Sequence, residues 1–273
     1  MMLPEPTADT WCSVHRFYSC VYPRNLEGGA QLVSGTRLVI TDSSTPFGGY
    51  WDLAGSVEGW FSELAVAMSD IFLTFQSLKS VNGDFLEIGA WHGRSAILWL
   101  MHARKNEKTF VVDLEARGPL AMNLERVSNA VDREFVLMKG SSFRIPDSGF
   151  QIEYRRKMRL VHIDGDHTAP GVYNDIQIGH GLLHMNGVMI VDDFMNPRFP
   201  QITEVVIEYL NQFSHDLSMI ACGANKAFIV RTKFYEFWAS HFEINLEREL
   251  GARIEGAAIY FGTAQNKKCF GIR

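Results

Sequence analysis

The stretch Phe85–Ala96 reads FLEIGAWHGRSA: a short apolar run, then a turn with two glycines, then the start of a helical pattern. Gly89 allows a sharp turn and a close approach of a ligand to the backbone, and Gly93 lets the next helix begin beside that ligand. The free N–H groups at such a helix start favour a carboxylate or another anion. The stretch therefore predicts a strand–turn–helix unit with a ligand at its turn.

The alternation of strand and helix patterns continues along the chain. Five short apolar runs occur, and most are followed by a helical pattern: DFLEIGA, TFVVDL, EFVLMKG, MRLVHID and GVMIVDD. Bare apolar runs suit strands covered on both faces, and this alternation is typical of a parallel sheet. Two more runs, LSMIAC and KAFIVRT, are separated by GAN and predict an antiparallel hairpin. We therefore expect an α/β fold, a doubly wound sheet whose five parallel strands are followed by a hairpin.

The segments that flank this core predict three parts of the chain. Residues 1–80 form an N-terminal extension that is rich in aromatic residues and includes a helix predicted over Val57–Leu78 from its apolar spacing. This extension acts either as a lid that excludes water or as a subunit interface, and the second alternative predicts a homo-oligomer. Residues 81–232 form the core. Residues 233–273 add a helix, and the run AAIYFG offers an edge strand.

Composition excludes several classes of protein. The 273 residues are 47% hydrophobic and 21% charged, as in an ordinary globular protein. A net charge of -5 argues against a nucleic-acid partner, because phosphate binding needs a concentrated positive field. No secretory signal or membrane-spanning segment is evident, so we expect a cytoplasmic protein with no membrane partner. The scattered cysteines indicate reduced thiols, with a bridge between the first two as the alternative: Cys12, Cys20, Cys222 and Cys269.

The glycine turn lacks the two best-known phosphate-binding patterns. No glycine stands at Trp91, so the dinucleotide pattern G-x-G-x-x-G is absent, as is the phosphate-binding G-x-x-x-x-G-K-S/T. What remains is an acid followed by two glycines, with Asp113 ending the second strand about 20 residues further on, where a carboxylate can bind both hydroxyls of a ribose. This spacing favours a nucleoside cofactor. The alternative for Glu87 alone is a strand-end charge that faces solvent.

Several segments together resemble a known family: FLEIGAWHGRSA, VVDL, KGSS, HIDGDH and NGVMIVDDF. They resemble the class I S-adenosylmethionine-dependent methyltransferases, in the branch of antibiotic-sugar O-methyltransferases and cephalosporin hydroxylase-type proteins. The resemblance covers residues 83–231 and implies a mostly parallel, seven-stranded, Rossmann-like sheet with S-adenosyl-L-methionine as cofactor. It implies that Asp113 holds the ribose, that Ser141 and Ser142 lie near the adenine, and that Glu87 lies under the amino-acid end. It also implies that four residues hold the methionine part: Gly89, Ala90, Gly93 and Ser95.

Three aspartates are expected to meet at one edge of the pocket. Asp164 ends the fourth strand, and Asp192 and Asp193 end the fifth, which is its neighbour in a doubly wound sheet. Three close carboxylates repel one another unless a cation neutralises them. Oxygen ligands suit Mg²⁺, with Mn²⁺ or Ca²⁺ as alternatives. We therefore predict a metal site at these three residues, although Asp164 could instead bind the amino group of the cofactor.

The same region offers candidates for a catalytic base. Methyl transfer from a sulfonium requires a nucleophilic oxygen, so a base must remove the proton of the acceptor. His167 lies three residues after Asp164, where related metal-dependent methyltransferases place a Lys or His base, and Asp166 is the second candidate. His162 faces the other way within its strand and is expected to pack. Another pair, His180 and His184, has helical spacing for a shared metal, but its helix should lie away from the pocket.

These features predict an enzyme that methylates a hydroxyl of a small molecule, a sugar or a phenolic secondary metabolite, with a divalent cation. One alternative is a metal-independent O- or N-methyltransferase. Another is a non-catalytic, cofactor-binding accessory protein of the same fold. Loss of activity in a chelator, restored by Mg²⁺, would favour the first hypothesis, and cofactor binding without turnover would favour the last.

Overall fold

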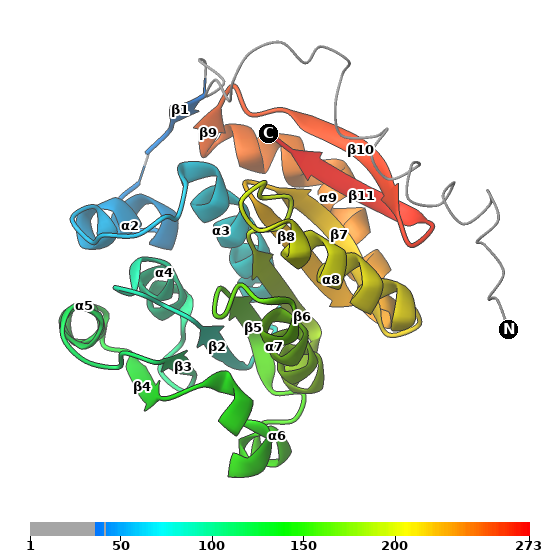
Figure 1. The fold of residues 1–273 in the computed structure, drawn as a ribbon. Helices are drawn as coiled ribbons and strands as arrows, with labels where there is room; N and C mark the ends of the chain where they lie inside the picture. The colour runs from blue at the N-terminus through cyan, green and yellow to red at the C-terminus, as the bar shows by residue number, and fades with distance from the viewer. Residues whose placement is uncertain (1–35, 41) are drawn as a thin grey trace, which may run out of the picture.

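A sheet with helices on both faces forms the centre of the molecule in the computed structural model (Figure 1), which describes residues 36–40 and 42–273. Nine strands lie in the order β10-β11-β7-β8-β6-β5-β2-β3-β4. Residues 1–35 and 41 of the predicted N-terminal extension, with Cys12 and Cys20, lie outside the described residues.

Five neighbouring strands are parallel, as predicted: β2 (Asp84–Ile88), β3 (Lys108–Asp113), β4 (Glu134–Lys139), β5 (Met158–Ile163) and β6 (Leu183–Asp192). The predicted hairpin is also present. Its second strand, β8 (Lys226–Arg231), pairs antiparallel with both β6 and β7 (Leu217–Gly223) and lies between them. The turn residues Ala224 and Asn225 have φ values of 50° and 65°, which suits a tight hairpin turn. The doubly wound fold class is therefore confirmed.

The sheet has two strands more than the seven expected. The predicted edge strand is β10 (Ile259–Ala264), and it forms a hairpin with β11 (Lys267–Ile272). Strand β11 then pairs parallel with β7, so the C-terminal segment extends the main sheet. The run KKCFGI was missed because two lysines and a glycine hide its apolar positions. A short separate pair joins β1 (Arg37–Leu38) to β9 (Ile254–Glu255).

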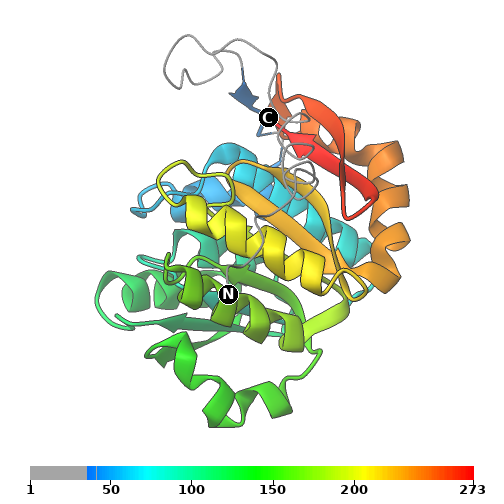
Figure 2. The same cartoon turned by 45° about the vertical axis from the view of Figure 1, so that its right-hand side comes forward.

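Helices cover the sheet in two layers (Figure 2). One apolar core joins the sheet to α2 (Pro46–Ala54), α3 (Glu63–Leu78), α4 (Arg94–His102), α5 (Pro119–Val131) and α9 (Tyr235–Gly251). A second core on the opposite face includes α6 (Phe150–Glu153), α7 (Ala169–Leu182) and α8 (Pro200–Gln212). Three single-turn helices are η1 (Ser142–Arg144), η2 (Pro146–Ser148) and η3 (Thr232–Phe234).

The helix predicted over Val57–Leu78 begins later than expected, at Glu63. Ser62 ends the preceding loop, and its Oγ accepts a hydrogen bond from the Ala65 N–H at 3.2 Å. A serine at this position satisfies a free N–H of the first turn and so favours a helix start there. The apolar residues just before it, including Trp60, continue the helical spacing by chance and lie in a loop.

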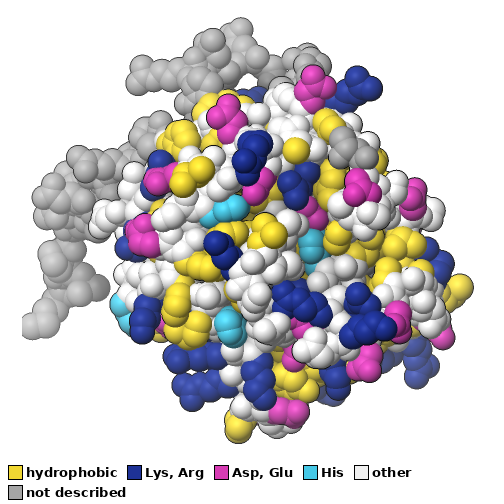
Figure 3. Space-filling model, turned by 180° about the vertical axis from the view of Figure 1, so that it is seen from behind, with side chains coloured by type: hydrophobic (Ala, Val, Ile, Leu, Met, Phe, Trp, Pro, Cys, Tyr) yellow, Lys and Arg dark blue, Asp and Glu magenta, His cyan; other side chains and the backbone are white. Residues whose placement is uncertain are grey.

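The character of the helices and the charge of the surface bear on the predicted absence of membrane and nucleic-acid partners. Among the described residues, no helix combines the length and apolar character needed to cross a membrane. On the face in Figure 3, Lys and Arg side chains are mixed with acidic and neutral ones. The absence of a nucleic-acid partner stays a prediction.

Candidate active site

The two glycines of the turn after β2 are required by neighbouring protein atoms. Gly89 has a φ of 80°, and a Cβ there would lie 2.0 Å from the carbonyl oxygen of Asp164. Gly93 has a φ of 87°, and a Cβ there would meet Leu120 Cδ1 at 3.1 Å. Both positions therefore need glycine for positive φ and for close packing. The sharp turn predicted at Gly89 is confirmed by its φ, and the roles of both glycines toward a ligand stay predictions.

Asp113 holds the glycine turn from the end of β3. Its Oδ2 accepts hydrogen bonds from the N–H groups of Ala90 at 2.8 Å and Trp91 at 3.1 Å. These bonds stabilise Trp91 at a φ of 51°, which is unusual for a bulky residue. Ser141 and Ser142 lie beyond the neighbouring strand β4, at the same edge of the sheet. The ribose and adenine roles of these residues stay predictions.

Glu87 belongs to a buried polar row that crosses four strands. Its Oε1 accepts a hydrogen bond from Ser95 Oγ and lies 2.9 Å from His162 Nδ1. The other ring nitrogen of His162 is 3.9 Å from Asp192 Oδ2, and Asp192 forms an ion pair with Lys226. Glu87 is therefore not a charge that faces solvent. His162 is fully buried and packs against Trp99 as expected, with 5.3 Å between ring centroids, and its Nδ1 also pairs with Glu87.

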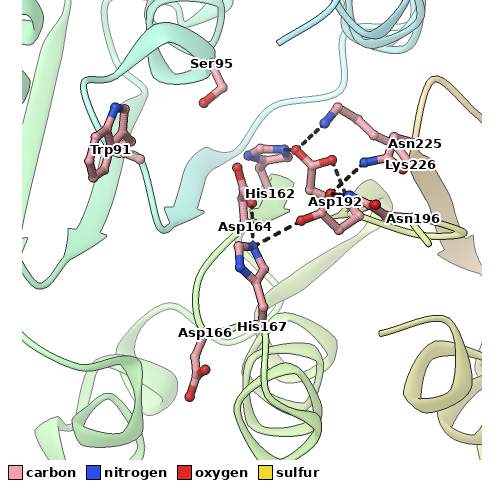
Figure 4. A network of polar contacts seen from close by, with 12 residues as sticks. Trp91, Ser95, His162, Asp164, Asp166, His167, Asp192, Asn196, Asn225 and Lys226 are labelled. Carbon is pink, nitrogen blue, oxygen red and sulfur yellow. Dashed lines mark hydrogen bonds and ion pairs between the residues drawn. The ribbon is translucent and has the colours of Figure 1, made fainter. Parts of the chain in front are cut away.

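Asp164 and Asp193 come together as predicted, and His167 contacts both; Figure 4 shows His167 beside Asp164. His167 Nε2 is 3.4 Å from Asp164 Oδ1 and 3.2 Å from Asp193 Oδ2. One possible ligand atom of each residue lies within 4.8 Å of the others, and all three side chains are partly exposed. We call these three residues the acid cluster.

Asp192 does not join the acid cluster, contrary to the prediction of a three-aspartate site. Its carboxylate turns to Lys226, which is its direct partner across β6 and β8. It also accepts a hydrogen bond from the backbone N–H of Asp193 at 2.7 Å. Lys226 is a buried cation, so it offers Asp192 a strong local partner. The sequence alone did not show that Lys226 would face Asp192.

Two asparagines that the sequence reasoning missed orient Asp193. Asn196 and Asn225 each donate a hydrogen bond from Nδ2 to Asp193 Oδ1 at 2.6 Å. Asn225 was recognised only as a turn residue of the GAN stretch. Phe199, which was also missed, stacks on the His167 ring with 4.4 Å between ring centroids. These contacts hold the acid cluster from two separate loops.

The family comparison matches the region that carries these residues. Residues 86–194 match a family model described as a methyltransferase domain. This match covers less than half of the 273-residue chain. The resemblance to class I S-adenosylmethionine-dependent methyltransferases is therefore confirmed for this segment, which includes the glycine turn and the whole acid cluster. Among curated proteins, none matches the chain significantly.

Several solved structures match this chain at low identity. MycE methyltransferase from the mycinamycin biosynthetic pathway, in complex with Mg, SAH and mycinamycin VI, has 13% identity and a TM-score of 0.51, and the match covers 68% of this chain and 53% of MycE. This chain thus matches about half the length of MycE. The O-methyltransferase NovP has 17% identity and a TM-score of 0.47, over 64% of this chain and 83% of NovP. The calicheamicin methyltransferase CalS11 has 13% identity and a TM-score of 0.47, over 76% of this chain and 98% of CalS11.

The glycine turn of the methyltransferase domain fits the methionine part of the cofactor. Glu87 Oε2 is buried and has no hydrogen-bond partner among the described residues, so it can accept a bond from an ammonium group. Helix α4 begins after Gly93 without a side-chain cap, so its first N–H groups suit a carboxylate. The turn therefore presents acceptors and donors that match an amino-acid zwitterion.

The acid cluster of the methyltransferase domain also controls the ionisation of His167. The hydrogen bond to Asp164 is the largest effect and raises the pKa of the His167 imidazole. Partial burial opposes this shift, whereas the charges of Asp164, Asp193 and Asp192 add to it. The imidazole is therefore a stronger proton acceptor than a free histidine. Its Nε2 can accept a proton or bind a cation, but it cannot do both at once.

The other sequence candidates lie elsewhere in the domain or make separate contacts. Asp166 points away from the acid cluster (Figure 4), and its carboxylate accepts bonds from the N–H and hydroxyl of Thr168 at 3.0 Å. His180 lies 2.6 Å from Asp216, and His184 accepts a bond from the backbone of Asn186 at 3.1 Å. The two histidines of α7 and β6 therefore do not form a shared metal site.

Proposed function

We propose that this chain is an S-adenosylmethionine-dependent methyltransferase that acts on a hydroxyl of a small molecule, a sugar or a phenolic metabolite, with a divalent cation. The observation that carries the proposal is the convergence of Asp164, His167 and Asp193 beside a glycine turn that fits the methionine part of the cofactor. Both features lie within the methyltransferase domain.

The chemistry of methyl transfer assigns a role to each member of the acid cluster. When bound, the cofactor supplies a methyl group on a sulfonium, and a cation lowers the pKa of a coordinated hydroxyl. Asp164 and Asp193 would hold the cation through carboxylate oxygens, which suit Mg²⁺. His167 would accept the hydroxyl proton at Nε2. The presence of Mg and SAH in the MycE complex is consistent with this proposal.

The main alternative is a methyltransferase that needs no metal. It is favoured by the position of His167 Nε2, which lies between the two carboxylates where a cation would otherwise bind. A protonated His167 would neutralise part of the charge of the acid cluster without an ion. A measurement of cation binding by the purified protein therefore distinguishes a metal-dependent methyltransferase from a metal-independent one.

The test combines activity with cation binding. We expect methylation of a hydroxyl acceptor that is lost in a chelator and restored by Mg²⁺. His167→Ala should lower turnover by roughly 10²- to 10⁴-fold, because a positioned base contributes about that much. Asp166→Asn is the matched control and should keep full activity, since Asp166 points away from the acid cluster.

Calorimetric titration of each variant with Mg²⁺ completes the test. If His167→Ala keeps its cation affinity, the result supports the role of His167 as the catalytic base. If the affinity is lost, His167 is a metal ligand. Turnover that survives the chelator would contradict the role of the cation. SAH binding without turnover on any hydroxyl acceptor would instead support an accessory protein.

A further inference from the structure

A cavity of about 390 Å³ is lined in part by Asn225, which donates a hydrogen bond to Asp193 of the acid cluster. Residues 59–62, which precede α3, form one wall, and the hairpin residues 224–226 form another. Arg94, from the first turn of α4, and Asp192 complete the lining. The cavity therefore lies between the helix that follows the glycine turn and the residues that support Asp193. Its volume suits a small molecule.

The cavity carries one positive charge that no acid neutralises. Of its two cations, Lys226 is paired with Asp192. Arg94 donates one hydrogen bond from Nη1 to the Val57 carbonyl at 2.8 Å, and its buried Nε has no partner among residues 36–40 and 42–273. Within the same residues, no carboxylate forms an ion pair with Arg94. This charge stands out in a chain whose net charge is -5, and guanidinium groups bind carboxylates well.

Two tryptophans expose their rings at this place. Trp60, which lines the cavity, is 85% exposed, and Trp91 of the glycine turn is 57% exposed. Their ring centroids are 6.4 Å apart. Large aromatic faces that are open to water beside a cavity favour contact with the face of another ring.

We propose that this cavity binds the methyl acceptor and selects a planar aromatic ring that carries a carboxylate. The ring packs on Trp60, and the carboxylate pairs with Arg94. Asn225, which also lines the cavity, connects it to the acid cluster through its hydrogen bond to Asp193. This inference rests on the proposed methyl transfer, of which it names the acceptor class, but its test needs only binding.

The test uses a matched pair of probes, 4-hydroxybenzoate and the neutral 4-hydroxybenzyl alcohol, titrated calorimetrically into the full chain in the presence of SAH. The acid should bind at least about tenfold more tightly than the alcohol, and Arg94→Gln should remove this preference. Trp60→Ala should weaken both probes. Arg126→Gln is the control, because Arg126 also bonds to a backbone carbonyl, at 2.6 Å, but does not line the cavity.

A separate titration with SAH alone shows whether Arg94 binds the carboxylate of the cofactor or that of the acceptor. If Arg94→Gln weakens SAH and leaves 4-hydroxybenzoate unchanged, Arg94 binds the carboxylate of the cofactor and the acceptor inference is wrong. Equal binding of acid and alcohol to the wild-type chain, or no binding of the acid, would also overturn it. If the acid binds as expected but no methylation follows, only the proposed function fails.

Discussion

Asp175 on α7 is a buried acid that shares its surroundings with Ser142 of the predicted adenine side. Its side chain is 0% exposed, and Oδ2 has no hydrogen-bond partner among the described residues. Desolvation raises the pKa of Asp175 to about 6, although hydrogen bonds from Ser142 and Asn174 oppose the shift. The folded protein therefore favours the protonated form of Asp175 more than the unfolded chain does.

This shift predicts a pH-dependent stability. The pKa of Asp175 is higher in the folded protein than in the unfolded chain, so Asp175 contributes to the free energy of unfolding when it is protonated. This contribution is complete below the unfolded pKa of 3.8 and is lost as the pH rises through about 6. The full loss is about 3 kcal/mol, because each pKa unit corresponds to about 1.4 kcal/mol. Asp175→Asn removes the ionisation, so the variant should gain about 2 kcal/mol relative to wild type between pH 4 and pH 7. Urea unfolding at both pH values measures this, and a constant difference would contradict it.

At the scale of elements, the β7–β8 hairpin connects the end of the sheet to the acid cluster. Asn225 occupies a turn position with a φ of 65° and binds Asp193 through its amide. Asn225→Gly keeps the backbone conformation, since glycine adopts positive φ readily, but removes that hydrogen bond. We expect Mg²⁺ affinity to fall roughly 10- to 100-fold, the usual effect of losing a residue that orients a ligand.

The control for this variant is a matched turn in the last hairpin. Asn266 has a φ of 60° in the β10–β11 turn. Asn266→Gly makes the same backbone change there and should leave cation affinity unchanged. Equal effects of the two substitutions in calorimetric titration would show that chain flexibility, rather than the bond to Asp193, sets the affinity.

At the scale of the whole molecule, the C-terminal helix α9 completes one of the two cores. Trp238 is fully buried, and its ring centroid lies 5.1 Å from that of Phe72 on α3. Trp238→Ala would leave a large cavity between these helices and should cost about 3–5 kcal/mol of unfolding free energy. Ile244→Ala in the same helix is the control, because Ile244 is 80% exposed. Denaturant unfolding compares the two, and equal small losses would mean that α9 is not part of the cooperative core.

Much of the fold could be predicted from local patterns. The five parallel strands and the GAN hairpin follow from short apolar runs and turn residues, which are properties of neighbouring positions. The start of α3 at Glu63 was missed because a serine cap outweighed apolar spacing. Strand β11 was missed because its pairing with β7 depends on residues about 50 positions away in the chain.

The sequence by itself determined the class of fold and the presence of Asp164, His167 and Asp193 at one edge of the sheet, because parallel strands bring their carboxyl ends together. Only the tertiary structure decided which side chains meet there. Asp192 turns to Lys226 on an antiparallel strand, and His162 bonds to Glu87 across two strands. These choices depend on the register of strands far apart in the chain and on the strength of buried charge pairing, which local patterns do not encode.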